Sequence, residues 1–198
     1  AELLEVIELY EAWIDERGKQ AATLPVQHRA AANSNVSECR ACAARMRLGL
    51  ELLKSDPQAL EAFRLANHAM LLQQMASERA PRYSQFDSKL GLIQFSEPYA
   101  PPSVDSPIRP GQGTWRAFQI AFLLMCISSA ADPTVEDREA VELILFPTGG
   151  GKTEAYLGLA AFTIFLRRLK DPNDTGVQVL MRYTLRLLTA QQFQRASR

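Results

Sequence analysis

The stretch 146-FPTGGGKTE-154 follows the apolar residues 141-VELIL-145. Three consecutive glycines remove every side chain from this turn, so its backbone N–H groups can converge on one bulky anion. A helix that begins at the end of the turn would add its unpaired N–H groups and the positive end of its dipole. Lys152 offers a mobile charge for terminal phosphates, and Thr153 offers a hydroxyl for Mg²⁺. The stretch therefore predicts a cradle for a nucleoside triphosphate.

The elements on either side of the glycines predict the fold class. Residues 141–146 are apolar and β-branched, as in a buried strand, and residues 153–169 have the composition of a largely apolar helix. Residues 177–181 (VQVLM) indicate a second strand, and a last helix is expected to begin near Thr184. Strand, loop, helix and strand predict a parallel, right-handed βαβ unit that is buried on both faces. We therefore expect an α/β protein in which only the first strands of a parallel sheet are present.

The first 80 residues have a helical pattern instead. Apolar residues recur at helical spacing in residues 3–14, and Ser37 is expected to cap a helix that runs from Glu38 towards Leu53. In the next stretch, Asp56 is a suitable N-cap because Pro57 follows it at the first helical position. Three such helices predict a helical bundle.

Prolines divide the rest of the chain. Residues 81–113 lose all periodicity and contain six prolines, at positions 81, 98, 101, 102, 107 and 110. We expect three regions: a helical domain over residues 1–80, a Pro-rich linker or long loop over residues 81–113, and an ATP-binding domain over residues 114–198.

Composition is that of a soluble globular protein, since 47% of the 198 residues are hydrophobic and 22% are charged. The longest apolar runs are shorter than the roughly 18 residues of a membrane span, no leader pattern is present, and there are three cysteines. We therefore expect a cytoplasmic protein without membrane contact. The chain begins without methionine and ends inside an expected helix, so we expect it to be part of a longer protein.

Charge is distributed unevenly along the chain. From Leu145 to Arg198 there are eight Lys or Arg against three Asp or Glu, whereas the preceding residues hold 14 against 19. A basic surface beside a phosphate loop suits a nucleic-acid partner, although such charges also occur on ordinary solvated faces.

Three motifs now resemble a known family. FPTGGGKTE resembles motif I of superfamily 2 helicases, a Walker A P-loop, with Phe146 where the strict pattern has glycine. RAFQ at residues 116–119 resembles the R-x-x-Q element that reads adenine in that superfamily. TLRLLTAQQ at residues 184–192 resembles motif Ia, with Thr184 in place of proline. The resemblance implies RecA-like domains around an ATP site, so the expected fold is a helical bundle followed by an incomplete RecA-like P-loop domain.

A closer resemblance covers most of the chain. The helicase-like subunit of the DISARM anti-phage defence systems is similar in four stretches, at residues 62–74, 115–125, 143–169 and 179–195. This resemblance implies ATP-driven action on DNA, with ATP and Mg²⁺ as cofactors. DNA, as a single strand or a duplex, and other defence-system subunits are the implied partners.

The candidate site residues follow from these motifs. Lys152 is the catalytic candidate and Thr153 the metal ligand. The nucleotide-binding candidates are Arg116, Gln119, Thr148, Gly149, Gly150, Gly151, Lys152, Thr153 and Glu154. The nucleic-acid-binding candidates, expected at the end of the second strand, are Arg182, Thr184, Arg186 and Gln191.

Some residues keep two interpretations. Gln119 can pair with the N6 and N7 edge of adenine, or it is a polar residue on an amphipathic helix. Trp115 can pack in the core or stack on a base. Cys39 and Cys42 have a metal-like spacing, but inside a helix such a pair more often packs than binds zinc.

The missing parts limit the expected chemistry. Phosphoryl transfer needs an acidic residue at a strand end to hold Mg²⁺, and after Thr153 the only carboxylates are Glu154, Asp171 and Asp174. We therefore expect a helicase or ATPase in the full-length parent, and no hydrolysis by these 198 residues alone. The alternatives are a restriction- or chromatin-type DNA translocase subunit, or a nucleotide-gated interaction module without motor activity.

Overall fold

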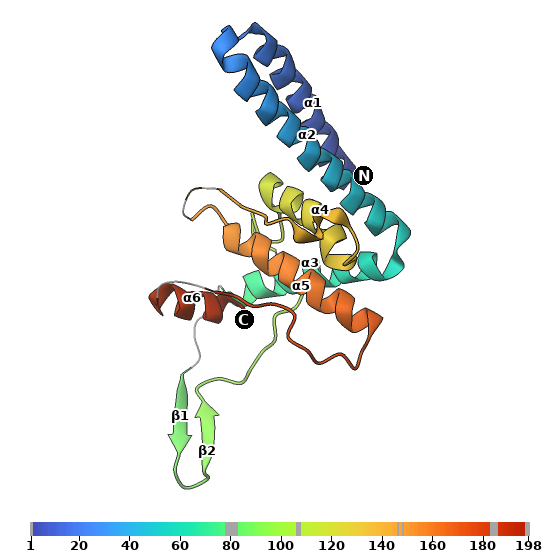
Figure 1. The fold of residues 1–198 in the computed structure, drawn as a ribbon. Coiled ribbons are helices and arrows are strands. Elements are labelled where there is room, and N and C mark those ends of the chain that lie inside the picture. Colours follow the sequence, from blue (N-terminus) through green and yellow to red (C-terminus); the bar gives the residue numbers. More distant parts are fainter. Residues whose placement is uncertain are drawn as a thin grey trace. The chain divides into compact units, whose positions relative to one another are not determined.

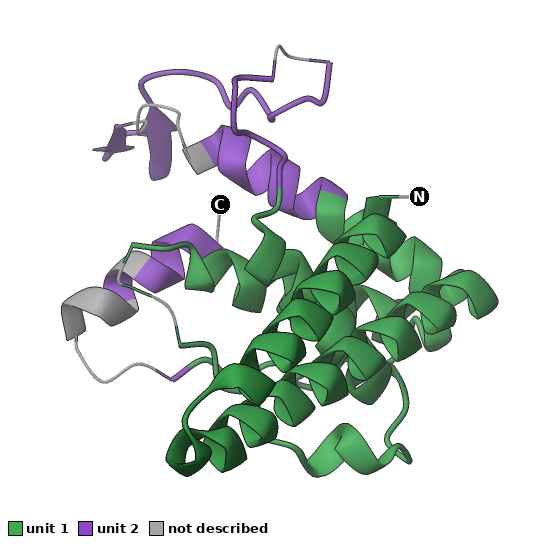
Figure 2. Ribbon diagram, turned by 90° about the horizontal axis from the view of Figure 1, so that it is seen from above, with its two compact units in different colours: residues 1–67, 115–181 green, residues 68–114, 182–198 purple. Residues whose placement is uncertain are grey.

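The computed structural model describes residues 2–77, 83–105, 108–145, 147, 149–182 and 186–196. The chain forms two compact units, one of residues 1–67 and 115–181 and the other of residues 68–114 and 182–198 (Figure 2). Each unit is described by itself below. The division into three regions expected from the sequence stays a prediction.

The first unit begins with two long antiparallel helices, α1 (Glu2–Thr23) and α2 (Val26–Ser55) (Figure 1). Pro25 stands at the N-cap of α2, where its missing N–H costs nothing. The predicted helix start at Ser37 is wrong, because the residues before it contain no helix-breaking residue and α2 runs through it. Ile7 and Ile14 of α1 are buried, as is Met46 of α2, so the two helices share an apolar seam.

The helix α3 (Pro57–Ser77) starts as the sequence predicts. The Asp56 carboxylate accepts hydrogen bonds from the backbone N–H groups of Gln58 (2.8 Å) and Ala59 (3.1 Å), so it caps the first turn. In the first unit, α3 contributes small buried side chains to the core, Ala59, Ala62 and Ala66.

The central helix of the first unit is α4 (Ala117–Ala131), which contacts both α2 and α5 (Lys152–Lys170). It buries Ile120, Leu123, Leu124 and Ile127 in the main core, together with Phe162 and Leu166 of α5. A short 3₁₀ helix, η1 (Glu136–Glu139), follows α4. The helical part of the prediction thus agrees with a bundle.

The predicted parallel sheet is wrong. Residues 141–145 and 177–181 form no strand, and the strands in the described part of the chain are β1 (Ser84–Asp87) and β2 (Leu92–Phe95), an antiparallel pair. A strand needs neighbours to satisfy its N–H and C=O groups, and two apolar segments are too few to make a stable parallel sheet. The chain is therefore mainly helical rather than α/β.

The second unit contains this hairpin, the last turns of α3 and the helix α6 (Arg186–Ala196). The hairpin lies inside the segment predicted to be a linker or loop, and Phe86 faces Ile93 across it. The Gln73 side chain of α3 donates to the carbonyl of Arg195 in α6 (3.0 Å). Of the helices in the described ranges, none has both the length and the apolar character needed to cross a bilayer.

Candidate functional site

The glycine loop leads directly into α5. Gly149 and Gly151 have φ values of 78° and 88°, a left-handed conformation that side chains with a Cβ adopt at a cost. The N–H of Gly150 donates to the carbonyl of Pro147 (3.1 Å), which closes the turn. Gly151 is the N-cap of α5, and as a glycine it has no side chain with which to cap the first turn of the helix. This arrangement is suited to binding an anion.

Lys152 is the first residue of α5 and lies over the loop. Its ammonium donates to the carbonyl of Pro147 at 3.1 Å, and its side chain is half-buried. Thr153 and Glu154 follow in the same turn and are also half-buried. The predicted residue Thr148 lies outside the described residues.

Two side chains at the start of α4 contact the glycine loop directly. Arg116 is the N-cap of α4, and its guanidinium donates to the carbonyl of Gly150 (2.8 Å). Gln119 is 4% exposed, and its amide nitrogen donates to the carbonyl of Gly151 (2.7 Å). The amide oxygen of Gln119 accepts from the backbone N–H of Arg116 (2.8 Å), so Gln119 caps the start of its own helix. The structure therefore brings together the R-x-x-Q element and the glycine loop through two contacts that span 34 and 32 residues of sequence.

Close packing fixes the distance between α4 and the loop. A Cβ on Gly151 would lie 2.7 Å from the amide nitrogen of Gln119, which only glycine permits without a shift. Farther along α5, Gly158 lies against Trp115, whose ring would be 2.7 Å from an added Cβ. The indole N–H of Trp115 donates to the Asn67 side chain (2.6 Å). Of its two interpretations, Trp115 thus fits the structural one.

The nucleic-acid candidates belong to the second unit. Arg182 is exposed and lies outside regular structure. Arg186 and Gln191 belong to α6, but their side chains, like all of Thr184, fall outside the described part of the structure. Their predicted roles stay predictions.

The sequence did not predict the ion pairs around the segment that leads into the loop. Arg45 of α2 forms ion pairs with Asp137 and Glu142, although Arg45 is far from both in sequence. One signal could have indicated this pairing, because Glu142 is the single charged residue in the apolar stretch 141-VELILF-146 and a charge in such surroundings needs a partner.

The two cysteines with metal-like spacing are free thiols on α2. Cys39 and Cys42 are both half-buried, and burial raises the pKa of the Cys42 thiol above its ordinary value. Within the described ranges, no group of three or more His, Cys, Asp or Glu side chains is arranged to hold a metal ion.

Comparison with known proteins gives one strong similarity. The DISARM protein DrmA of Bacillus paralicheniformis is 36% identical over 200 residues, which cover 96% of this chain. The same alignment covers 16% of DrmA, so the chain spans about one sixth of the length of this relative. No protein-family model matches the chain.

Proposed function

We propose that this chain is the ATP-binding portion of a DNA helicase or translocase that acts in bacterial anti-phage defence. The observation that carries the proposal is the contact of Arg116 and Gln119 with the carbonyls of Gly150 and Gly151. A glycine turn formed by chance would have no reason to hold an arginine and a buried glutamine from another helix. Similarity to DISARM protein DrmA supports the defence role over a restriction- or chromatin-type translocase.

The proposed cradle assigns a role to each part. The N–H groups of the loop and of the first turn of α5 would bind the phosphates, with Lys152 on the terminal ones. Thr153 would supply a hydroxyl to Mg²⁺, as the equivalent residue does in P-loops. The fit rests on this donor set: two positive-φ glycines, a helix N-terminus, a lysine and a hydroxyl within the five residues 149–153.

Calorimetry with ATP and Mg²⁺ tests the proposal. We expect the wild-type chain to bind ATP and Lys152→Ala to bind it at least about tenfold more weakly, since hydrogen bonds to charged groups contribute about 1.5–3 kcal/mol. Lys170→Ala is the matched control, because Lys170 ends the same helix and donates to the carbonyl of Ala131 (3.0 Å). The control should lose some stability and keep its ATP affinity. Equal ATP affinity in wild type and Lys152→Ala would refute the cradle.

DNA binding is proposed for Arg182, Thr184, Arg186 and Gln191. Replacing Arg186 and Gln191 together by alanine should weaken DNA binding equally for all sequences and reduce its salt dependence. Each lost phosphate contact lowers the slope of log K against log salt by about 0.7–0.9. Arg195→Ala on the same helix is the control and should change neither quantity. A loss confined to one DNA sequence would contradict backbone binding.

A nucleotide-gated interaction module is the second candidate. A groove of about 270 Å³ lies between α1 and α2 and is lined mainly by apolar residues, among them Trp13, Leu24 and Val36. Trp13 is 47% exposed, which suits contact with another defence-system subunit. ATP binding without DNA-stimulated hydrolysis by the longer parent protein would favour this candidate over the motor.

A further inference from the structure

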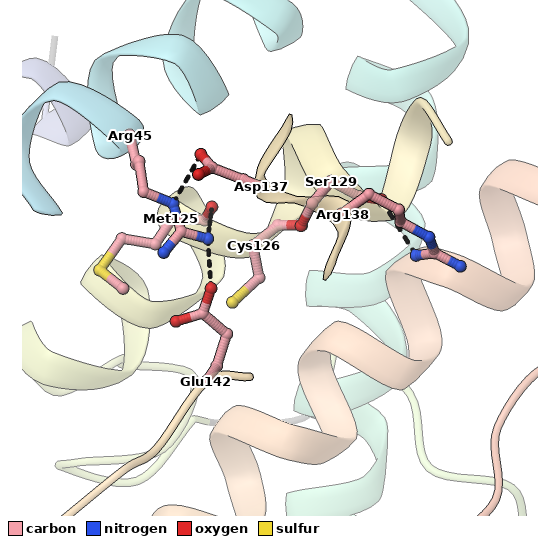
Figure 3. Close-up of polar contacts among 7 residues, drawn as sticks. All are labelled: Arg45, Met125, Cys126, Ser129, Asp137, Arg138 and Glu142. Atoms are coloured by element: carbon pink, nitrogen blue, oxygen red, sulfur yellow. Dashed lines mark hydrogen bonds and ion pairs between the residues drawn. The ribbon is translucent and has the colours of Figure 1, made fainter. Parts of the chain in front are cut away.

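Arg45 joins three parts of the first unit. Its guanidinium projects from α2, and its side chain is 17% exposed (Figure 3). Its Nε lies 2.9 Å from the Asp137 carboxylate of η1, and its Nη2 pairs with Glu142 and lies 3.4 Å from the carbonyl of Met125 in α4. The guanidinium therefore links α2 to α4 and to the segment that enters the glycine loop.

Glu142 forms its ion pair with Arg45 in a partly buried position. Its side chain is 22% exposed, so the ion pair lies where water screens it only in part. The hydrogen bond with Glu142 is also the largest cause of the raised pKa of Arg45. Arg138 adds a tie of its own, because it donates to the carbonyl of Ser129 (3.0 Å) and so fixes η1 to the end of α4 (Figure 3).

The segment after Glu142 keeps one side against the core. Ile144 packs on a small cluster of Phe122, Cys126 and Ala155, and Ala155 belongs to the first turn of α5. Val141, Leu143 and Leu145 alternate with these inward residues and are 86–94% exposed. Within residues 141–145, Glu142 and Ile144 are thus the residues that face inward and orient this segment.

We propose that Arg45 is a positioning residue for the nucleotide, which acts by holding Glu142 and so fixing the entry of the glycine loop. Arg116 and Gln119, at the start of α4, contact the end of the loop that leads into α5. Arg45, in α2, contacts the segment that leads into the loop. The N-terminal helices would then set ATP affinity without touching ATP. This inference rests on the proposed function.

The test compares two arginines of the same helix. Arg47 also makes an ion pair, since its Nε donates to Glu11 of α1 (2.6 Å), but that pair leads away from the loop. Two quantities are measured for Arg45→Met and Arg47→Met: the Kd for ATP with Mg²⁺, and hydrogen exchange of the amides of residues 149–152 without nucleotide. We expect Arg45→Met to raise the Kd for ATP about tenfold, which is a usual effect for residues that are energetically coupled. We also expect it to speed the hydrogen exchange of these amides. Arg47→Met should change neither.

A second pair of variants covers a folding defect of Arg45→Met, which leaves two carboxylates without their partner. Glu142→Gln keeps the shape of the side chain and removes its charge. We expect it to speed hydrogen exchange of the loop amides and to weaken ATP binding. Arg45→Lys keeps the charge but not the forked geometry, so it should recover part of the wild-type affinity. If Arg45→Met does not fold, these two variants test the positioning role in its place.

The outcomes separate the two proposals. If wild type binds no ATP, the proposed function fails. The hydrogen-exchange measurement alone then tests whether Arg45 fixes the entry of the glycine loop. If wild type binds ATP and the Arg45 and Glu142 variants match it in affinity, the positioning role is refuted while the ATP site stands. Equal effects from Arg45→Met and Arg47→Met would also refute it, since they would indicate general destabilisation.

Discussion

Gln119 combines burial with unused hydrogen-bonding capacity. Its amide holds the N–H of Arg116 and the carbonyl of Gly151, yet a primary amide still has one more N–H and one more lone pair. These remaining groups are the pair that adenine requires at N6 and N7. The same side chain can thus support the loop and read the base.

We expect the chain to prefer ATP over GTP and Gln119→Ala to erase that preference, which corresponds to about 1–3 kcal/mol for one bidentate pair. Competition binding of both nucleotides measures it. Gln58→Ala is the control, because Gln58 likewise donates to a backbone carbonyl of α5, that of Leu169 (3.1 Å), at the far end of the helix. A Gln119→Ala variant that is as selective as wild type would leave Gln119 a purely structural residue.

We expect Cys126 to make the stability of the first unit depend on pH. The thiol is 3% exposed, and burial, aided by the Glu142 charge, raises its pKa from 9.0 to about 12. In the unfolded chain the thiol loses its proton near pH 9, while in the folded protein it keeps it, so unfolding releases a proton above pH 9. Stability should therefore fall as pH rises from about 9 towards 12, by up to about 1.4 kcal/mol per pH unit. Urea unfolding between pH 8 and 11 measures this, and the difference from Cys126→Ala isolates the thiol. Parallel pH profiles for the two proteins would contradict the assignment.

At the scale of elements, sequence reasoning succeeded where the cause is local. Asp56 followed by Pro57 predicts a helix start because a carboxylate that accepts from two backbone amides needs no distant partner. The strand at residues 141–146 failed for the opposite reason. Its β-branched, apolar pattern favours a strand, but a strand forms only against a neighbour, and the pattern carries no information on whether one is available. The pairing of Arg45 with Glu142 is equally non-local. Its only indication in the sequence is that Glu142 is a single charged residue in an apolar stretch.

Gly49 sets the distance between two core helices. A Cβ at this position in α2 would lie 1.9 Å from the backbone carbonyl oxygen of Leu124 in α4, and backbone cannot move aside as a flexible side chain can. We expect Gly49→Ala to destabilise the first unit by about 1–3 kcal/mol, the usual cost of overpacking. Gly18→Ala in α1 is the control, since its nearest neighbours lie at 3.5 and 3.7 Å. That variant should gain about 0.5–1 kcal/mol from helix propensity. Chemical unfolding of both variants checks the opposite signs.

At the scale of the whole molecule, we expect ATP binding without ATP hydrolysis. Asp171 and Asp174, the last carboxylates in the sequence, follow the C-terminus of α5, which at 19 residues is about 28 Å long. Asp174 is also paired with Arg167, which lowers its pKa. Neither residue can hold a metal ion beside Thr153 at the other end of the helix. We expect these 198 residues to bind ATP and to release no phosphate, with or without DNA. Steady phosphate release that Lys152→Ala abolishes would show a catalytic acid elsewhere in the chain.

The motifs identified candidate site residues, whose roles stay predictions, but they did not predict the helical fold around them. Arg116 and Gln119 of RAFQ donate to the carbonyls of Gly150 and Gly151, although the parallel sheet predicted from the sequence is not formed. These segments are joined by hydrogen bonds to the loop carbonyls and by the close approach at Gly151. The arrangement of the helices around them depended on packing between residues far apart in sequence, which no motif records.

The exposed row of Val141, Leu143 and Leu145 has a practical consequence for handling the protein. An extended backbone with bare aliphatic side chains and unused N–H and C=O groups is a template on which a second molecule can add itself. Precipitation should then grow with protein concentration, because the chain has a formal net charge of zero at pH 7 and so little net repulsion to keep molecules apart. A lysine at position 143 would act as a gatekeeper and keep samples clear, without touching any residue of the nucleotide cradle.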